Sequence, residues 1–199
     1  MRKLKIAVIF GLVLSILLGS VGGFSAQCND IRGKVLRLHI LANSDSKEDQ
    51  ALKLKVRDRV LKETGAFFVA QTKSEAQENV KEHIDLVKSV AKDEIKKQGY
   101  DYDVDVKLVE MFFNTRQYDD ITMPAGKYQA MRITIGAAKG KNWWCVLYPP
   151  MCIPSAQPKK ELGDVLSDEQ LNIVEENPKY EVRFAIVELF ENIKEKLFG

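Results

Sequence analysis

A stretch without charged side chains, from Ile6 to Phe24, constrains this chain more than any other feature. Three cations precede it within the first five residues, and small residues follow its most apolar part. A cationic flank, an apolar core and small residues are typical of a secretory signal. Because the stretch also approaches the ~20 residues that a membrane-spanning helix needs, an uncleaved anchor is the alternative. We therefore predict a signal peptide or N-terminal membrane anchor at residues 1–26 and a soluble exported domain at 27–199.

The charge of the part after residue 26 is nearly balanced, with 27 Lys and Arg against 28 Asp and Glu. Binding to a nucleic-acid backbone needs a concentrated basic surface, so this balance argues against nucleic acid as a partner. The chain is 45% apolar, which excludes a disordered polyampholyte. The length after residue 26 suits one domain with a real hydrophobic core.

Apolar periodicity and turn residues predict the order of the elements. Strands are expected at 35–42, 102–113, 127–135 and 143–148, and helices from about 46 to 63, from 74 to 98 and from 177 onward. The last two strands are expected to pair as a hairpin. Residues 114–125 are expected to be a loop, and residues 154–168 an exposed, loop-like stretch. The fold class is α+β: a single domain with a mainly antiparallel or mixed sheet of about four strands, two consecutive helices after the first strand, and a C-terminal helix.

Capping residues mark the expected helix starts. Ser46 followed by Asp49, and Ser74 followed by Gln77, each have the spacing of a capping box. Asn177, which precedes a proline, is the expected cap of the last helix. Apolar residues at helical spacing predict the buried side of that last helix: Val182, Ile186, Leu189, Ile193 and Leu197.

The cysteines fit an exported protein. Six residues separate Cys145 from Cys152, a spacing that is wrong for a C-x-x-C redox or zinc pair. It suits a short disulfide loop in an oxidising compartment, and two free buried thiols are the alternative. Cys28, next to the signal, has no evident role.

Convergent catalytic groups are scarce in this sequence. The two histidines are His39, inside an apolar strand, and His83, on a charged helix flank. The familiar hydrolase, zinc-protease and phosphate-loop motifs are absent, and two distant histidines do not make a zinc site. The enzymatic hypothesis that remains uses Cys145 as nucleophile, His39 as base and Asn43 or Asp45 as orienting group. We expect no metal and no cofactor.

Two segments concentrate unusual residues: His39–Asp58 and Gly140–Cys152. In a strand, the adjacent Trp143 and Trp144 must point to opposite faces, so a one-sided sheet would leave one indole exposed. An exposed indole marks a contact site, whereas helices on both faces would bury both. A disulfide around Tyr148–Pro150 would form a stiff projecting loop.

The same two segments resemble the stage II sporulation protein R family of endospore-forming bacteria. The stretch A-N-S-D-S-x-E-D-Q-x-L-K-x-x-V-R-D is present as Ala42–Asp58, and W-W-C-V-x-Y-P-P-x-C is present as Trp143–Cys152. The resemblance covers nearly the whole exported part and includes the order of elements and the signal.

The resemblance implies a signalling protein and not an enzyme. Such a protein is exported from the forespore into the space facing the mother cell. There it triggers a membrane-embedded aspartic protease that processes pro-sigma-E in the mother cell. Alternatives are a secreted cysteine-dependent hydrolase or amidase of the cell wall, and a cell-wall-binding module. No catalytic residue is carried over from the family. Candidate partner-binding residues are Trp143, Trp144, Tyr148, Pro149, Pro150, His39, Asn43, Asp45, Asp49, Lys53 and Arg57.

Overall fold

The computed structural model describes residues 2–118, 121–151, 161–175 and 181–198. It confirms the α+β class with a mixed four-stranded sheet and a C-terminal helix. The chain groups into two compact units. One unit comprises residues 34–111 and 127–166, and the other comprises 1–33, 112–126 and 167–199.

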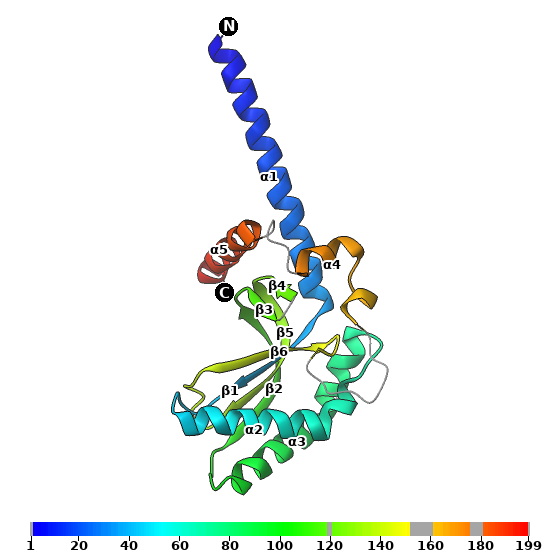
Figure 1. Cartoon of the computed structure of the whole chain (residues 1–199), viewed down its shortest axis with the longest axis vertical. Coiled ribbons are helices and arrows are strands. Elements are labelled where there is room, and N and C mark those ends of the chain that lie inside the picture. Colours follow the sequence, from blue (N-terminus) through cyan, green and yellow to red (C-terminus); the bar gives the residue numbers. More distant parts are fainter. Residues whose placement is uncertain (1, 119–120, 152–160, 176–180, 199) are drawn as a thin grey trace. The chain divides into compact units, whose positions relative to one another are not determined.

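The four-stranded sheet is the centre of the first unit (Figure 1). Its strands are β1 (Leu36–Leu41), β2 (Val104–Phe113), β5 (Gly126–Ile135) and β6 (Asn142–Tyr148), in the order β2-β5-β1-β6. Strand β1 runs parallel to β5 and antiparallel to β6. The predicted hairpin of β5 with β6 is therefore wrong, because β1 lies between them.

The connection from β5 to β6 crosses the end of β1, and hydrogen bonds hold it there. The backbone N–H groups of Lys139 and Gly140 donate to the carbonyl oxygens of Asn43 and Ala42, at 3.1 and 3.0 Å. These bonds satisfy the two backbone N–H groups of the connection. In a hairpin of β5 and β6, such groups would have paired within the hairpin itself.

Helices cover one face of this sheet: α2 (Lys47–Thr64) and α3 (Lys73–Lys97), joined by the 3₁₀ helix η1 (Gly65–Phe68) (Figure 1). Strands and helices share one hydrophobic core, which contains Leu38 and Ile40 of β1 and Val56 of α2. The expected stripe of α3 packs into it, with Ile84 partly buried and four members fully buried: Val80, Val87, Ala91 and Ile95.

The two predicted helix starts differ in outcome. The Ser46 side chain accepts a hydrogen bond from the Asp49 N–H, as expected for the cap of α2. Helix α3 begins earlier than predicted, because Thr72 and not Ser74 accepts from the N–H of Glu75. The Glu75 carboxylate in turn accepts from the N–H of Gln71. The cap of α3 therefore lies at Thr72, two residues before the predicted cap at Ser74.

The second unit contains α1 (Arg2–Lys34), α4 (Asp168–Val174), α5 (Glu181–Phe198) and a small sheet of β3 (Arg116–Tyr118) and β4 (Ile121–Met123). The prediction of a loop over 114–125 is therefore wrong, because these short strands pair antiparallel. Within the part of the chain that the structure describes, no helix has both the length and the hydropathy of a membrane span.

The segment predicted as an exposed loop, 154–168, is only partly described. Residues 152–160 lie outside the described ranges. The rest contains the 3₁₀ helix η2 (Leu162–Asp164), and both Leu162 and Leu166 are buried, so the expected exposure is wrong there. Ser167 then caps α4 through a reciprocal pair with Gln170.

The C-terminal helix buries a different face from the predicted one. Its buried residues are Phe184, Val187 and Glu191, and each member of the predicted apolar stripe, from Val182 to Leu197, is exposed. The buried face meets α1: the rings of Phe24 and Phe184 lie 5.3 Å apart. The predicted cap at Asn177 lies outside the described residues.

Candidate functional site

The Ala42–Asp58 segment forms a hydrogen-bonded cluster around one carboxylate. Asp49 is 4% exposed and accepts from the Asn43 amide at 2.8 Å and from the Ser44 hydroxyl. Burial alone would raise the pKa of Asp49. Hydrogen bonds from Ser44, Asn43 and Tyr102 outweigh burial and hold that pKa below its usual value. The carboxylate is thus a buried structural anion at neutral pH.

The same cluster ties the β5–β6 connection to the start of α2. The Asn43 amide oxygen accepts from the N–H of Ala137 at 2.9 Å, and the Asp45 carboxylate accepts from the N–H of Lys141 at 2.6 Å. The Lys53 ammonium donates to the Lys141 carbonyl at 3.0 Å, and burial lowers the pKa of this lysine. Together with Asp49, these make four candidate binding residues that form hydrogen bonds within the fold, and Asp45 does so from an exposed position.

Gly136 shows how closely this cluster is packed. Its φ of +56° lies in the left-handed region, and a Cβ there would come within 2.3 Å of the Asn43 amide oxygen. Any side chain at this position would be strained and would also displace the amide that orients the connection.

The two adjacent indoles lie on opposite faces of β6, as predicted, but neither is fully buried or fully exposed. Trp143 packs against the helix-covered core, and the Arg57 guanidinium lies 4.9 Å from its ring centre. Trp144 stacks on His39 on the other face, with ring centres 3.9 Å apart. Burial lowers the pKa of His39 to about 4, so the imidazole is neutral at pH 7.

The structure separates the residues of the enzymatic hypothesis. Cys145 pairs across the strands with Leu38, and both belong to the core on the helix-covered face. His39 is the next residue of β1, so its side chain points to the opposite face of the sheet. Cys145 and His39 therefore do not form a nucleophile–base pair.

The end of β6 does not project as expected. Tyr148, Pro149 and Pro150 are buried, and the Tyr148 hydroxyl donates to the carbonyl of Gln71 at 2.9 Å. Cys152 lies outside the described residues, so its disulfide with Cys145 stays a prediction. Cys28 is a buried free thiol. Burial raises its pKa to about 12, so the thiol is protonated and unreactive.

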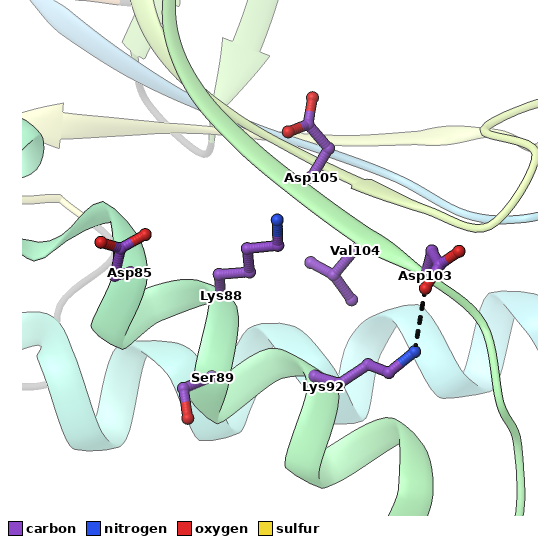
Figure 2. A pocket seen from close by; sticks show the side chains of 7 residues that line it. All are labelled: Asp85, Lys88, Ser89, Lys92, Asp103, Val104 and Asp105. Atoms are coloured by element: carbon purple, nitrogen blue, oxygen red, sulfur yellow. Dashed lines mark hydrogen bonds and ion pairs between the residues drawn. The ribbon is translucent and has the colours of Figure 1, made fainter.

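A groove that the sequence did not indicate lies between α3 and β2 (Figure 2). It has a volume of about 480 Å³ and is lined by Asp85, Lys88, Ser89 and Lys92 of α3 and by Asp103, Val104 and Asp105 at the start of β2. Lys92 pairs with Asp103 at 3.1 Å and also donates to the carbonyl of Tyr102. In the sequence these residues resemble an ordinary solvated helix flank. Only the strand order shows that the flank borders a sheet edge.

Across the described ranges, no group of three or more His, Cys, Asp and Glu side chains is arranged to hold a metal ion. At this end of the sheet, amide and carboxylate groups form hydrogen bonds with the backbone and with one another, and the two indoles stack on His39 and Arg57. Such an arrangement suits a rigid surface for contact with another molecule.

Comparisons with known proteins agree with the two sequence segments. The family model for stage II sporulation protein R (spore_II_R) matches residues 32–158. A relative from Bacillus subtilis (strain 168), named Stage II sporulation protein R, is 34% identical over 185 residues, which cover 82% of this chain and 83% of that protein. No solved structure matches. The chain therefore belongs to the stage II sporulation protein R family.

Proposed function

We propose that this protein is an exported sporulation signal that activates a membrane-embedded aspartic protease, so that the protease processes pro-sigma-E in the mother cell. The observation that carries the proposal is the family match, which spans both characteristic segments, residues 42–58 and 143–152. The charge-free N-terminal stretch supports export across a membrane. We propose that this membrane is that of the forespore, so that the protein reaches the intermembrane space.

The rival proposal, a cysteine-dependent wall hydrolase, loses support from the sheet register. Cys145 and His39 occupy opposite faces of the sheet, and Cys145 is only 8% exposed. A nucleophile needs a base within hydrogen-bond reach, and His39 cannot supply one. A wall-binding module that uses the indoles remains the second alternative.

We propose that the contact surface is the end of the sheet that carries Trp143 and Trp144. Among them, Trp143, Trp144 and Arg57 are half-buried and Asp45 is exposed, so their outer parts are accessible. Stacking on His39 and Arg57 holds the two rings in place, which lowers the entropy lost when a partner orders them. We also propose that a Cys145–Cys152 disulfide holds the segment that follows.

The test is reconstitution of the protease and pro-sigma-E in membrane vesicles, followed by titration with the exported form of this protein. A ligand acts by occupancy, so processing should saturate when the protein is stoichiometric with the protease. Processing that continues at a small fraction of one equivalent would instead indicate turnover.

The control for this titration is the same protein incubated with purified cell wall and no protease. Release of soluble wall fragments would favour the hydrolase, and retention on the wall would favour the binding module. Absence of pro-sigma-E processing at saturating protein would contradict the proposed function.

A further inference from the structure

Helix α5 is apolar on two opposite sides. One side packs within its own unit through Phe184 and Val187, and the buried Glu191 on that side pairs with Arg32 of α1 at 3.1 Å. The other side carries exposed large apolar side chains: Val182, Ile186, Leu189, Phe190, Ile193 and Leu197. Their spacing of three and four residues places them in one stripe along the helix. A continuous exposed apolar stripe of this kind marks a contact surface.

Cations border this stripe on both sides. Arg183 and Lys194 share helical spacing with Phe190 and so lie along one border. Lys196 follows Ile193 by three residues and lies along the other border. All three cations are exposed, and neither lysine forms an ion pair or hydrogen bond with any residue in the described ranges.

Glutamates of α5 lie on the side that faces the interior of the unit. Besides the buried Glu191, the half-buried Glu188 accepts a hydrogen bond from the N–H of Thr115 at 3.1 Å. Glu195 is also half-buried and follows Glu191 by one helical turn. These carboxylates therefore point away from the stripe, and the solvent-facing side of α5 combines apolar side chains with cationic borders.

An apolar stripe between cationic borders is complementary to a surface of anionic lipids. In such a complex the apolar side chains enter the boundary between head groups and acyl chains, while lysine and arginine extend to the phosphates. A second copy of α5 on the same stripe would bring the cationic borders against each other, and like charges in contact are unfavourable. The charge pattern therefore favours lipid over self-association.

We infer that α5 lies on the surface of a membrane that contains anionic lipids, with its exposed stripe in the head-group region and Arg183, Lys194 and Lys196 against lipid phosphates. This goes beyond the proposed function, because lipid binding by α5 needs no protease. Binding of this kind holds an exported signal at the surface in which a membrane-embedded protease lies, so that the two meet by diffusion in two dimensions.

Flotation with lipid vesicles tests the inference. The protein is the secreted form purified from culture medium, because an uncleaved apolar stretch of α1 would itself bind vesicles. We expect it to float with vesicles of equal parts phosphatidylcholine and phosphatidylglycerol and to bind phosphatidylcholine alone more weakly. Added salt should weaken the binding to the anionic vesicles, since it screens the cationic borders.

Two substitutions on α5 have matched controls elsewhere. Leu189→Glu places a charge in the stripe and should weaken vesicle binding by about tenfold or more. Leu86→Glu makes the same change at an exposed leucine of α3 and should bind as the unmodified protein. Lys194→Glu should weaken binding to the anionic vesicles by about tenfold, and Lys62→Glu, at an exposed lysine of α2, should not. Thermal melting checks that each variant is folded.

The outcomes are distinguishable. Loss of flotation in both α5 variants, with both controls bound, supports the inference. No flotation of the folded unmodified protein, or normal flotation of either α5 variant, overturns it. A dimer in analytical ultracentrifugation that Leu189→Glu abolishes, without flotation, would assign the stripe to a second copy of the chain. The assay contains no protease, so a negative result leaves the proposed function intact.

Discussion

At the level of single residues, burial decides the chemistry of His39. The imidazole is 2% exposed, lies flat against Trp144 and has a pKa lowered to about 4. Its ordinary pKa, which the unfolded chain regains, is about 6.5. The unfolded state therefore binds more protons than the folded state between these two values, and the folded state loses stability as pH falls through this window.

We expect the free energy of unfolding to fall by about 2 kcal/mol between pH 7 and pH 5 because of His39. Urea unfolding of the unmodified protein at both pH values measures the loss. The variant His39→Gln should lack most of this pH dependence, whatever its stability at pH 7. His83→Gln is the matched control and should retain the full dependence. Equal pH dependence in His39→Gln and the unmodified protein would contradict a buried neutral imidazole.

At the level of elements, helix starts depend on which side chain captures the free N–H groups. Thr72 and Glu75 form the cap of α3, although Ser74 and Gln77 have the same spacing in the sequence. Competing caps two residues apart are hard to rank from sequence, because either could begin the same helix. The glutamate at the third position favours the upstream pair, since its carboxylate binds a backbone N–H strongly.

Replacing the two candidate caps separately distinguishes them. Thr72→Ala removes the acceptor of the Glu75 N–H and should lower the free energy of unfolding by about 1 kcal/mol. Ser74→Ala, inside the helix, should change it by less than about 0.5 kcal/mol. Chemical denaturation of both variants at pH 7 provides the measurement. A larger loss for Ser74→Ala than for Thr72→Ala would mean that the helix begins where the sequence suggested.

At the level of the whole molecule, the N-terminal helix α1 contains the expected export signal and also packs against α5. Its charge-free stretch has the character of an export signal, yet α1 continues unbroken past residue 26. Phe24, at the end of that stretch, is only 5% exposed and packs on Phe184 of α5. Further along α1, the buried pair of Arg32 and Glu191 joins the same two helices at 3.1 Å. The end of the predicted signal therefore belongs to the packing of this unit.

The position of signal cleavage should consequently affect stability. A protein that begins at Gly23 keeps Phe24, whereas one that begins at Gln27 loses it. We expect the shorter form to be less stable by about 1.5–3 kcal/mol, the usual contribution of a buried Phe side chain. Thermal and urea unfolding of both forms measure the difference. Phe24→Ala in the longer form should reproduce the loss, and equal stability of all three proteins would contradict this packing.

Much of the local structure could be predicted from the sequence. Alternating residues predicted β2, helical spacing predicted the buried stripe of α3, and Ser46 was correctly placed as the cap of α2. These features depend on neighbours within a few residues, so a local pattern is sufficient to encode them. The two segments at 42–58 and 143–152 also identified the family, which the comparisons confirmed.

The tertiary structure alone decided which elements meet. The insertion of β1 between β5 and β6 excluded the expected hairpin and, through the pairing register, placed Cys145 and His39 on opposite faces of the sheet. Likewise, α5 has several apolar residues on more than one side, and its contact with α1 selected the side with Phe184. Strand order and helix facing result from contacts between residues far apart in the chain, and the pattern within one element does not encode them.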